Sequence, residues 1–135
     1  QPTGYAVRAD GQGDVTATHV AWTVSRRVPL NPSMLVVGDE LYMLADSGIL
    51  TCLDARTGTV HYEERLLGPC SASPLFADGR IYAIDERGRC AVFKPGKTFE
   101  RLAVNDLEER TLASMSVCDN DLLIRTENAL YRIRK

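Results

Sequence analysis

The histidines are the first residues to consider for chemistry, and their surroundings do not support it. His19 and His61 are the only two in the chain, and neither has a serine, aspartate or cysteine partner in a known catalytic spacing. Both stand among strand-forming residues, which favours a structural role over a catalytic or metal-binding one. The sequence therefore predicts no catalytic residue and no metal ligand, and it leaves the cofactor-binding residues unknown.

The four cysteines leave their redox state open. Cys52, Cys70, Cys90 and Cys118 contain no CxxC pair, which disfavours zinc-ribbon and thioredoxin-like sites. Three of them fall in expected strands, where a free cysteine commonly acts as a small buried apolar residue. We favour buried thiols, keep a single disulfide as the alternative, and disfavour a reactive nucleophile.

Two acidic segments and one charge run have simple explanations. Asp10–Asp14 and Asp119–Asp121 superficially resemble calcium loops, but both lack the twelve-residue ligand series with its final glutamate. Turn formation explains both segments. Glu108–Arg110 is interpreted as a solvated loop between repeats.

Five aromatic residues could stack on a ligand or pack between sheets. They stand at equivalent points of repeated strands, which favours packing. The five are Trp22, Tyr42, Tyr62, Tyr82 and Tyr131.

Composition describes an ordinary globular chain of one-domain size. The 135 residues are 44% hydrophobic and 25% charged, and the net charge is −2. This balance gives no basic footprint for nucleic acid. No apolar run approaches the ~20 residues of a transmembrane segment. The chain begins with Gln1-Pro2, which indicates a mature or excised product whose export signal has been removed.

The elements that would position any site come from a tandem repeat. Segments beginning at Leu35, Leu75 and Ser116 share a short apolar strand, a polar turn and an alternating strand, at intervals of 40 and 41 residues. Such a period, with four short strands in each unit, is typical of β-propeller blades. We expect an all-β partial propeller with two complete and two partial blades.

The expected blades divide the chain into four segments. Residues 1–28 form a partial blade, residues 29–68 and 69–108 form complete blades, and residues 109–135 form a partial blade that stops one strand short. Such a set cannot close a ring, so it would expose apolar faces and unpaired edges. Either the chain is the C-terminal part of a larger propeller, which the missing strand favours, or copies assemble. We expect self-association or poor solubility in isolation.

Two motifs resemble the pyrroloquinoline-quinone-like (PQQ-like) repeat propellers. Leu53–Tyr62 is similar to the family's L-D-A-x-T-G-x-x-x-W core, with Tyr62 in the tryptophan position. Ser73–Tyr82 is similar to its S-P-x-x-x-D-G-R-x-Y motif. Gly13–Trp22 and Leu130–Ile133 also look like the C-terminal region of bacterial members. The resemblance covers nearly the whole chain and implies the propeller fold.

What the resemblance implies for function divides into two branches. Some members are quinone-dependent alcohol or sugar dehydrogenases, which hold PQQ and a divalent metal such as calcium near adjacent cysteines. This chain has no such cysteine pair and no matching metal set, so a non-catalytic scaffold or interaction module is preferred over a dehydrogenase fragment. The resemblance also implies a bacterial, periplasmic or otherwise exported protein. The expected partner is another protein, or further copies bound through open blade faces.

A binding surface is expected where loops project from the repeated strands at one end of the sheets. Its segments are the connections after the second and fourth strand of each unit. They are Asp46–Gly48, Asp85–Gly88 and Thr126–Asn128, with Val28–Pro32, Leu67–Ser71 and Glu108–Leu112.

Overall fold

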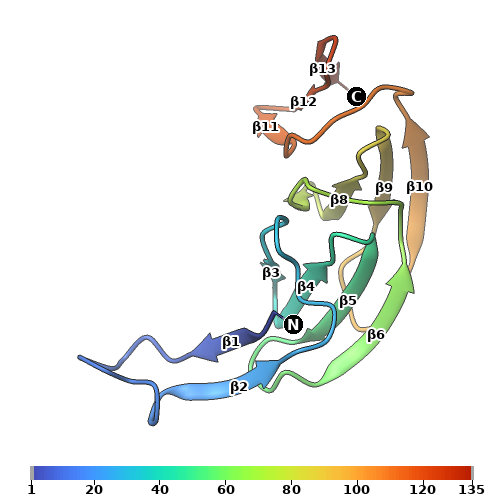
Figure 1. Cartoon of the computed structure of the whole chain (residues 1–135). Helices are drawn as coiled ribbons and strands as arrows, with labels where there is room; N and C mark the ends of the chain where they lie inside the picture. Colours follow the sequence, from blue (N-terminus) through green and yellow to red (C-terminus); the bar gives the residue numbers. More distant parts are fainter. Residues whose placement is uncertain (1, 135) are drawn as a thin grey trace.

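The computed structural model describes residues 2–134, and these residues contain thirteen β-strands and no helix. The strands form four antiparallel sheets that follow one another along the chain and stack in a curved row (Figure 1). Within this part of the chain there is accordingly no apolar helix of membrane-spanning length. The expected all-β partial propeller is confirmed.

Two of the sheets are complete, with four strands joined in sequence order. The first contains β3 (Leu35–Val37), β4 (Glu40–Leu44), β5 (Ile49–Asp54) and β6 (Val60–Arg65). The second contains β7 (Leu75–Ala77), β8 (Arg80–Ile84), β9 (Arg89–Phe93) and β10 (Arg101–Asp106). The long strands β6 and β10 lie on the outer side of the curve (Figure 1).

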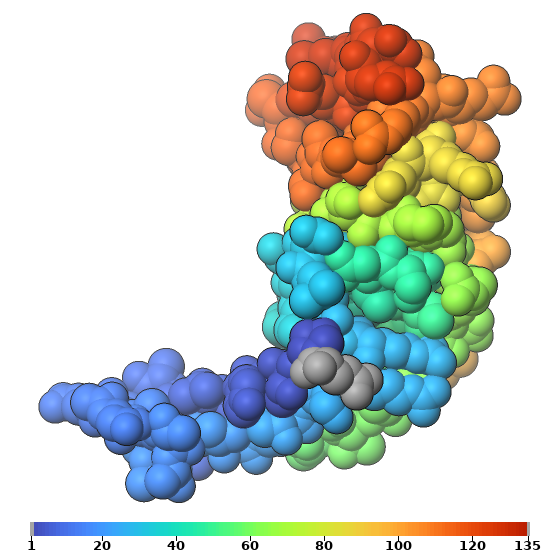
Figure 2. All heavy atoms as spheres, in the orientation of Figure 1, coloured from blue at the N-terminus to red at the C-terminus, as the bar shows by residue number. Residues whose placement is uncertain are grey.

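The two terminal sheets are partial. One pairs β1 (Gly4–Val7) with β2 (Val20–Val24), and their connection projects away from the stacked sheets as an arm (Figures 1 and 2). The other orders β11 (Ser116–Cys118), β12 (Asp121–Arg125) and β13 (Leu130–Arg134). The exact limits of the four sequence segments stay a prediction.

Equivalent hairpin turns join the first two strands of each repeat. The first turn residue has a positive φ in all three, 63° at Gly38, 48° at Asp78 and 53° at Asp119. Glycine adopts this conformation freely, and aspartate tolerates it better than most residues because its short side chain can bond to the local backbone. Repetition of this turn keeps the short strands β3, β7 and β11 in the same relation to their neighbours.

The core lies between successive sheets. The largest cluster joins Tyr42 and Leu50 of the first sheet to Ile81 and Phe93 of the second. A second cluster joins the second sheet to Met115 and the third sheet. All five predicted aromatics pack against one of the three clusters, so sheet-to-sheet packing is confirmed. They are Trp22, Tyr42, Tyr62, Tyr82 and Tyr131.

The connection between β9 and β10 differs from the expected tight turn at Pro95-Gly96. It extends over residues 94–100 and fills the space between the first two sheets. The Phe99 ring lies 5.7 Å from Tyr62 and 5.8 Å from Phe93, centroid to centroid. The Gly96 N–H donates to the Tyr42 hydroxyl at 2.7 Å. Because Phe99 packs here, β10 begins at Arg101, later than the sequence predicts.

The third sheet departs from the prediction that open faces are apolar. We call the face of each sheet that points toward the next repeat its leading face. In the first two sheets this face carries apolar pairs such as Tyr42 opposite Cys52. In the third sheet, the equivalent pair is Leu123 opposite Arg132, and the neighbouring pair is Asp121 opposite Arg134. Charged side chains thus cover most of the last leading face, as in the terminal units of repeat proteins.

Candidate functional site

The loops expected to form a binding surface do lie together at one end of the sheets. We call this set, made of the six segments named above, the rim. Residues 69–70 lie between two turns, because the Cys70 N–H donates to the Asp46 carbonyl at 2.9 Å and the Glu86 N–H donates to the Pro69 carbonyl at 2.8 Å. Residues 110–111 make the same pair of bonds to Glu86 and Glu127. The rim is therefore one hydrogen-bonded structure across three sheets.

Asp46 ties the first linker to this structure. Its carboxylate accepts hydrogen bonds from the Leu30 N–H at 2.7 Å and from the Asn31 side-chain amide at 2.6 Å. Partial burial raises the pKa of Asp46, but the hydrogen bonds from Leu30 and Asn31 outweigh it and hold the pKa below its ordinary value. Asp46 is therefore a charged structural acceptor rather than a proton donor.

Asp85 has the same task between the second sheet and its preceding linker. The side chain is 2% exposed and accepts hydrogen bonds from the Gly68, Arg87 and Arg89 N–H groups, at 3.2, 3.0 and 3.0 Å. The first bond comes from the linker and the other two come from the turn that Asp85 begins. This carboxylate fixes both segments at once.

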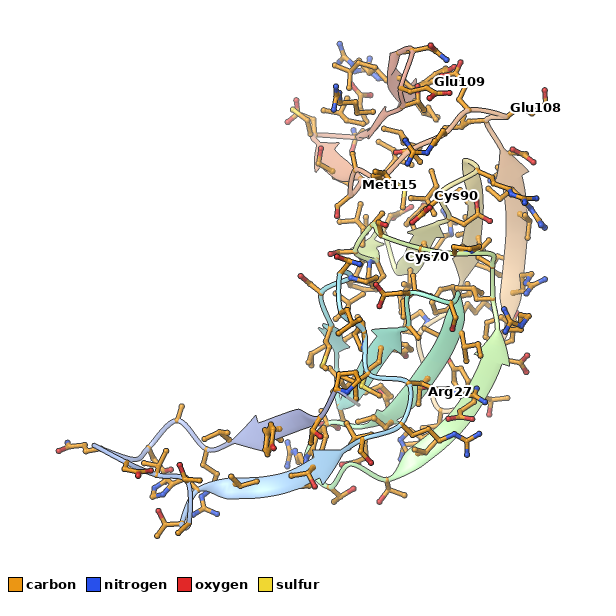
Figure 3. All side chains as sticks on the ribbon, viewed as in Figure 1. Arg27, Cys70, Cys90, Glu108, Glu109 and Met115 are labelled. Atoms are coloured by element: carbon orange, nitrogen blue, oxygen red, sulfur yellow. The ribbon has the colours of Figure 1, made fainter. Side chains whose placement is uncertain are left out.

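Glu109 anchors the third sheet to the rim (Figure 3). It accepts a hydrogen bond from the Tyr131 hydroxyl at 2.7 Å and a short one from the Thr126 hydroxyl. The Thr126 bond, followed by the Tyr131 bond, lowers the pKa of Glu109. The charge run Glu108–Arg110, interpreted from the sequence as a solvated loop, thus contains a residue with a specific structural role.

A row of serines links the sheets near their inner strands. The Ser33 N–H donates to the Ser73 hydroxyl at 2.9 Å, and the Ser73 N–H donates to the Ser114 hydroxyl at 2.9 Å. Sequence analysis missed this row and the role of Asp85. The interval of 40 or 41 residues between the serines was the signal that could have identified them.

The structure does not assemble the sequence candidates into a catalytic group. The His19 Nδ1 lies 2.7 Å from the Thr18 hydroxyl in the arm, while His61 lies in β6. The Nε2 of His61 has no hydrogen-bond partner among residues 2–134. In the same range no three His, Cys, Asp or Glu side chains stand close enough to hold a metal ion.

The cysteines are free thiols, and one of them differs from the expectation of burial. Cys52, Cys70 and Cys90 are buried, whereas Cys118 is exposed. Cys90 lies 4.0 Å from the Met115 sulfur across the interface between the second and third sheets (Figure 3). Cys118 lies on the leading face of the last sheet, which no further sheet covers among the described residues, so its place in a strand does not bury it.

We expect one thiol per chain to react with a water-soluble maleimide under native conditions. Burial raises the pKa of Cys52 to about 11, that of Cys70 to about 12 and that of Cys90 to about 11, so these three stay protonated and covered. Mass spectrometry should find one label before unfolding and four in denaturant. The control Cys118→Ser should lose the native label; rapid native labelling of a second thiol would contradict the assignment.

The acidic turn Asp119–Asp121 contains two different residues. Asp119 has the positive φ of a turn, as predicted. Asp121 is instead the first residue of β12, is 2% exposed, and accepts bonds from Arg134 at 2.6 and 3.0 Å and a short bond from Arg132. The Arg134 bond is the largest cause that holds the pKa of Asp121 at about 2, below its ordinary 3.8.

This lowered pKa predicts an acid-sensitive third sheet. A carboxylate whose pKa is lower in the folded chain stabilises it above the unfolded value, and that contribution is lost as pH falls through the folded value. We therefore expect the stability due to Asp121 to decline from about pH 4 to about pH 2. Denaturant titrations across this range should show a smaller decline in Asp121→Asn. An equal decline in both proteins would contradict this role of Asp121.

Comparisons with known proteins agree on the architecture. The model of the family described as outer membrane protein assembly factor BamB matches residues 11–123. BamB from Moraxella catarrhalis superposes with a TM-score of 0.64 at 16% identity, over 85% of this chain and 39% of that one. This chain therefore spans about two fifths of the BamB chain. No curated protein matches it.

Two dehydrogenases have the same fold over part of their length. A europium-containing methanol dehydrogenase gives a TM-score of 0.57 at 15% identity, over 77% of this chain and 21% of that one. Quinohemoprotein alcohol dehydrogenase ADHIIG from Pseudomonas putida HK5 gives 0.60 at 15% identity, over 75% and 17%. At such identities these likenesses show the fold alone.

Proposed function

Because the chain belongs to the PQQ-like repeat family described as outer membrane protein assembly factor BamB, we propose that it is part of a non-catalytic β-propeller scaffold that binds a protein partner. The observation that carries this proposal is the rim. Asp46, Asp85 and Glu109 are all engaged in holding loops together, which leaves the rim rigid. Rigid loops that expose apolar side chains suit protein recognition.

The rim exposes two such side chains. Leu30 is 75% exposed in the first linker, and Leu112 is 48% exposed in the third. Leu112 also borders a pocket of about 210 Å³ between residues 110–113 and 125–127. We propose that these leucines are contact points for the partner. The family description supports a role in the assembly of outer membrane proteins and therefore an exported location.

Site-specific photo-cross-linking in the full-length protein tests this function. A photoreactive residue at Leu30 or Leu112 should cross-link to one and the same protein in the producing cells. The matched control is Lys97, an exposed residue of the 94–100 loop at the opposite end of the sheets, which should give no such product. Absence of any product from both leucines, or equal products from all three positions, would refute the rim as the binding surface.

A second candidate is a piece of a quinone-dependent dehydrogenase, which the two dehydrogenase folds favour. The residues of this chain fit PQQ and calcium poorly. The carboxylates of the rim accept bonds from backbone N–H groups and hydroxyls, and Cys70 and Cys90 lie buried in separate parts of the structure (Figure 3). Dye-linked oxidation of alcohols or sugars by the full-length protein, dependent on added PQQ and calcium, would support this candidate and refute the scaffold.

Self-association of the isolated chain stays a prediction, and the structure directs it to the N-terminal sheet. Tyr5 and Val7 are 65% and 51% exposed, whereas the last leading face carries charges. Light scattering should therefore show association that Tyr5→Ser with Val7→Ser reduces. The matched control Leu130→Ser, on the third sheet, should leave it unchanged. A monomer at all concentrations would contradict this prediction.

A further inference from the structure

The outer edge of β13 is open. In the two complete sheets, β5 pairs with β6 and β9 pairs with β10, so a fourth strand covers the third. In the last sheet β13 holds the position of β5 and β9, and within residues 2–134 no strand pairs with its outer edge. The backbone N–H and C=O groups of such an edge can pair with a strand from another chain.

An apolar cleft lies behind this edge. It occupies about 1080 Å³ between the second and third sheets. Apolar side chains form most of its walls, among them Tyr82, Val92, Leu122, Ile124 and Ile133. Between the first and second sheets, the corresponding space is filled by the 94–100 loop, with Phe99 against Tyr62 and Gly96 against Tyr42. The cleft is thus the unfilled counterpart of a packed interface.

The other side of β13 is positively charged. Arg132 and Arg134 point to the leading face and are 65% and 63% exposed. Both guanidinium groups share the single carboxylate of Asp121, and Arg125 lies on the same face. Three cations thus face one anion. Asp78 and Asp119 line the part of the cleft formed by the hairpin turns that precede β8 and β12, two strands away from β13.

We propose that β13 binds an extended peptide segment of a partner protein, in which carboxylate and apolar side chains alternate. Successive side chains of a strand point to opposite faces, so one set would meet Arg132 and Arg134 while the other enters the cleft. Backbone pairing along β13 supplies affinity, and the alternation supplies specificity. This inference rests on the proposed function as an interaction module but uses a surface separate from Leu30 and Leu112.

Fluorescence anisotropy of a labelled Glu-Val-Glu-Phe-Glu-Val peptide with the 135-residue chain tests this site. Replacement of the three glutamates by lysines should weaken binding at least about tenfold, because each cross-strand charge pair changes sign. N-methylation of alternate peptide amides should weaken it as strongly, because strand pairing is lost. Both comparisons leave the protein unchanged, so they do not depend on how a variant folds.

Protein variants then locate the site. Arg132→Gln should weaken binding of the acidic peptide, while Arg87→Gln, an exposed arginine in the turn after β8, should not. Equal binding of all three peptides, no binding of the acidic peptide, or binding insensitive to N-methylation would overturn the proposal. So would light scattering that shows β13 occupied by a second copy. Failure here leaves cross-linking from Leu30 and Leu112 unaffected, which separates this site from the proposed function.

Discussion

Gly48→Ala should destabilise the chain by about 3–5 kcal/mol, among the largest effects available to a single methyl group. An added Cβ at Gly48 would lie 2.0 Å from the Gly68 carbonyl oxygen and 2.4 Å from that of Leu67. Neither oxygen can move freely, because the Leu66 and Leu67 N–H groups donate to the Gly48 carbonyl at 3.0 and 3.2 Å. The substitution therefore forces the linker away from the turn of the first sheet.

Gly79→Ala separates this clash from the backbone strain. Gly48 and Gly79 both have a positive φ, 84° and 70°, but an added Cβ at Gly79 meets nothing within 4 Å. We expect Gly79→Ala to cost only about 1 kcal/mol, the ordinary penalty of a left-handed residue. Urea unfolding followed by circular dichroism and by fluorescence of Trp22 measures both. Equal costs would mean that the close approach of the linker does not stabilise the rim.

The repeat allowed most of the fold to be predicted from the sequence. Alternating apolar residues and two-residue polar turns are local signals, and their recurrence at 40 or 41 residues determines how the sheets follow one another. The start of β10 was predicted too early because Phe99 belongs to a loop that packs between sheets. Its burial depends on Tyr62 and Phe93, which local periodicity does not reveal.

The site was predictable in position but not in chemistry. The sequence placed the loops of the rim correctly, since each follows the same strand of its repeat. It did not distinguish Asp121, which forms ion pairs, from Asp119, which forms a turn, because the arginine partners lie in another strand. It also assigned burial to Cys118 from its strand alone. Burial of a strand residue depends on a neighbouring sheet, and β11 has none on its leading face among the described residues.

Asp85→Ala should cost about 3 kcal/mol, because it leaves the Gly68, Arg87 and Arg89 N–H groups without their buried acceptor. Asp85→Asn keeps one acceptor oxygen and should recover part of this loss. The bond to Gly68 joins two repeats, so its removal should also loosen the linker. Hydrogen exchange at the Gly68 amide should therefore accelerate in Asp85→Ala more than exchange at amides in β4.

Two comparisons within the chain sharpen this test. Asp54 also accepts bonds from turn N–H groups, those of Arg56 and Thr57, but it lies at an exposed turn, so Asp54→Ala should cost only about 1 kcal/mol. Ala45 occupies the place of Asp85 in the first sheet, and its turn forms without a carboxylate. If Asp85→Ala costs no more than Asp54→Ala, the turn alone suffices in the second sheet as well. The carboxylate would then not be what holds the linker, and the rigidity ascribed to the rim would lose its main support.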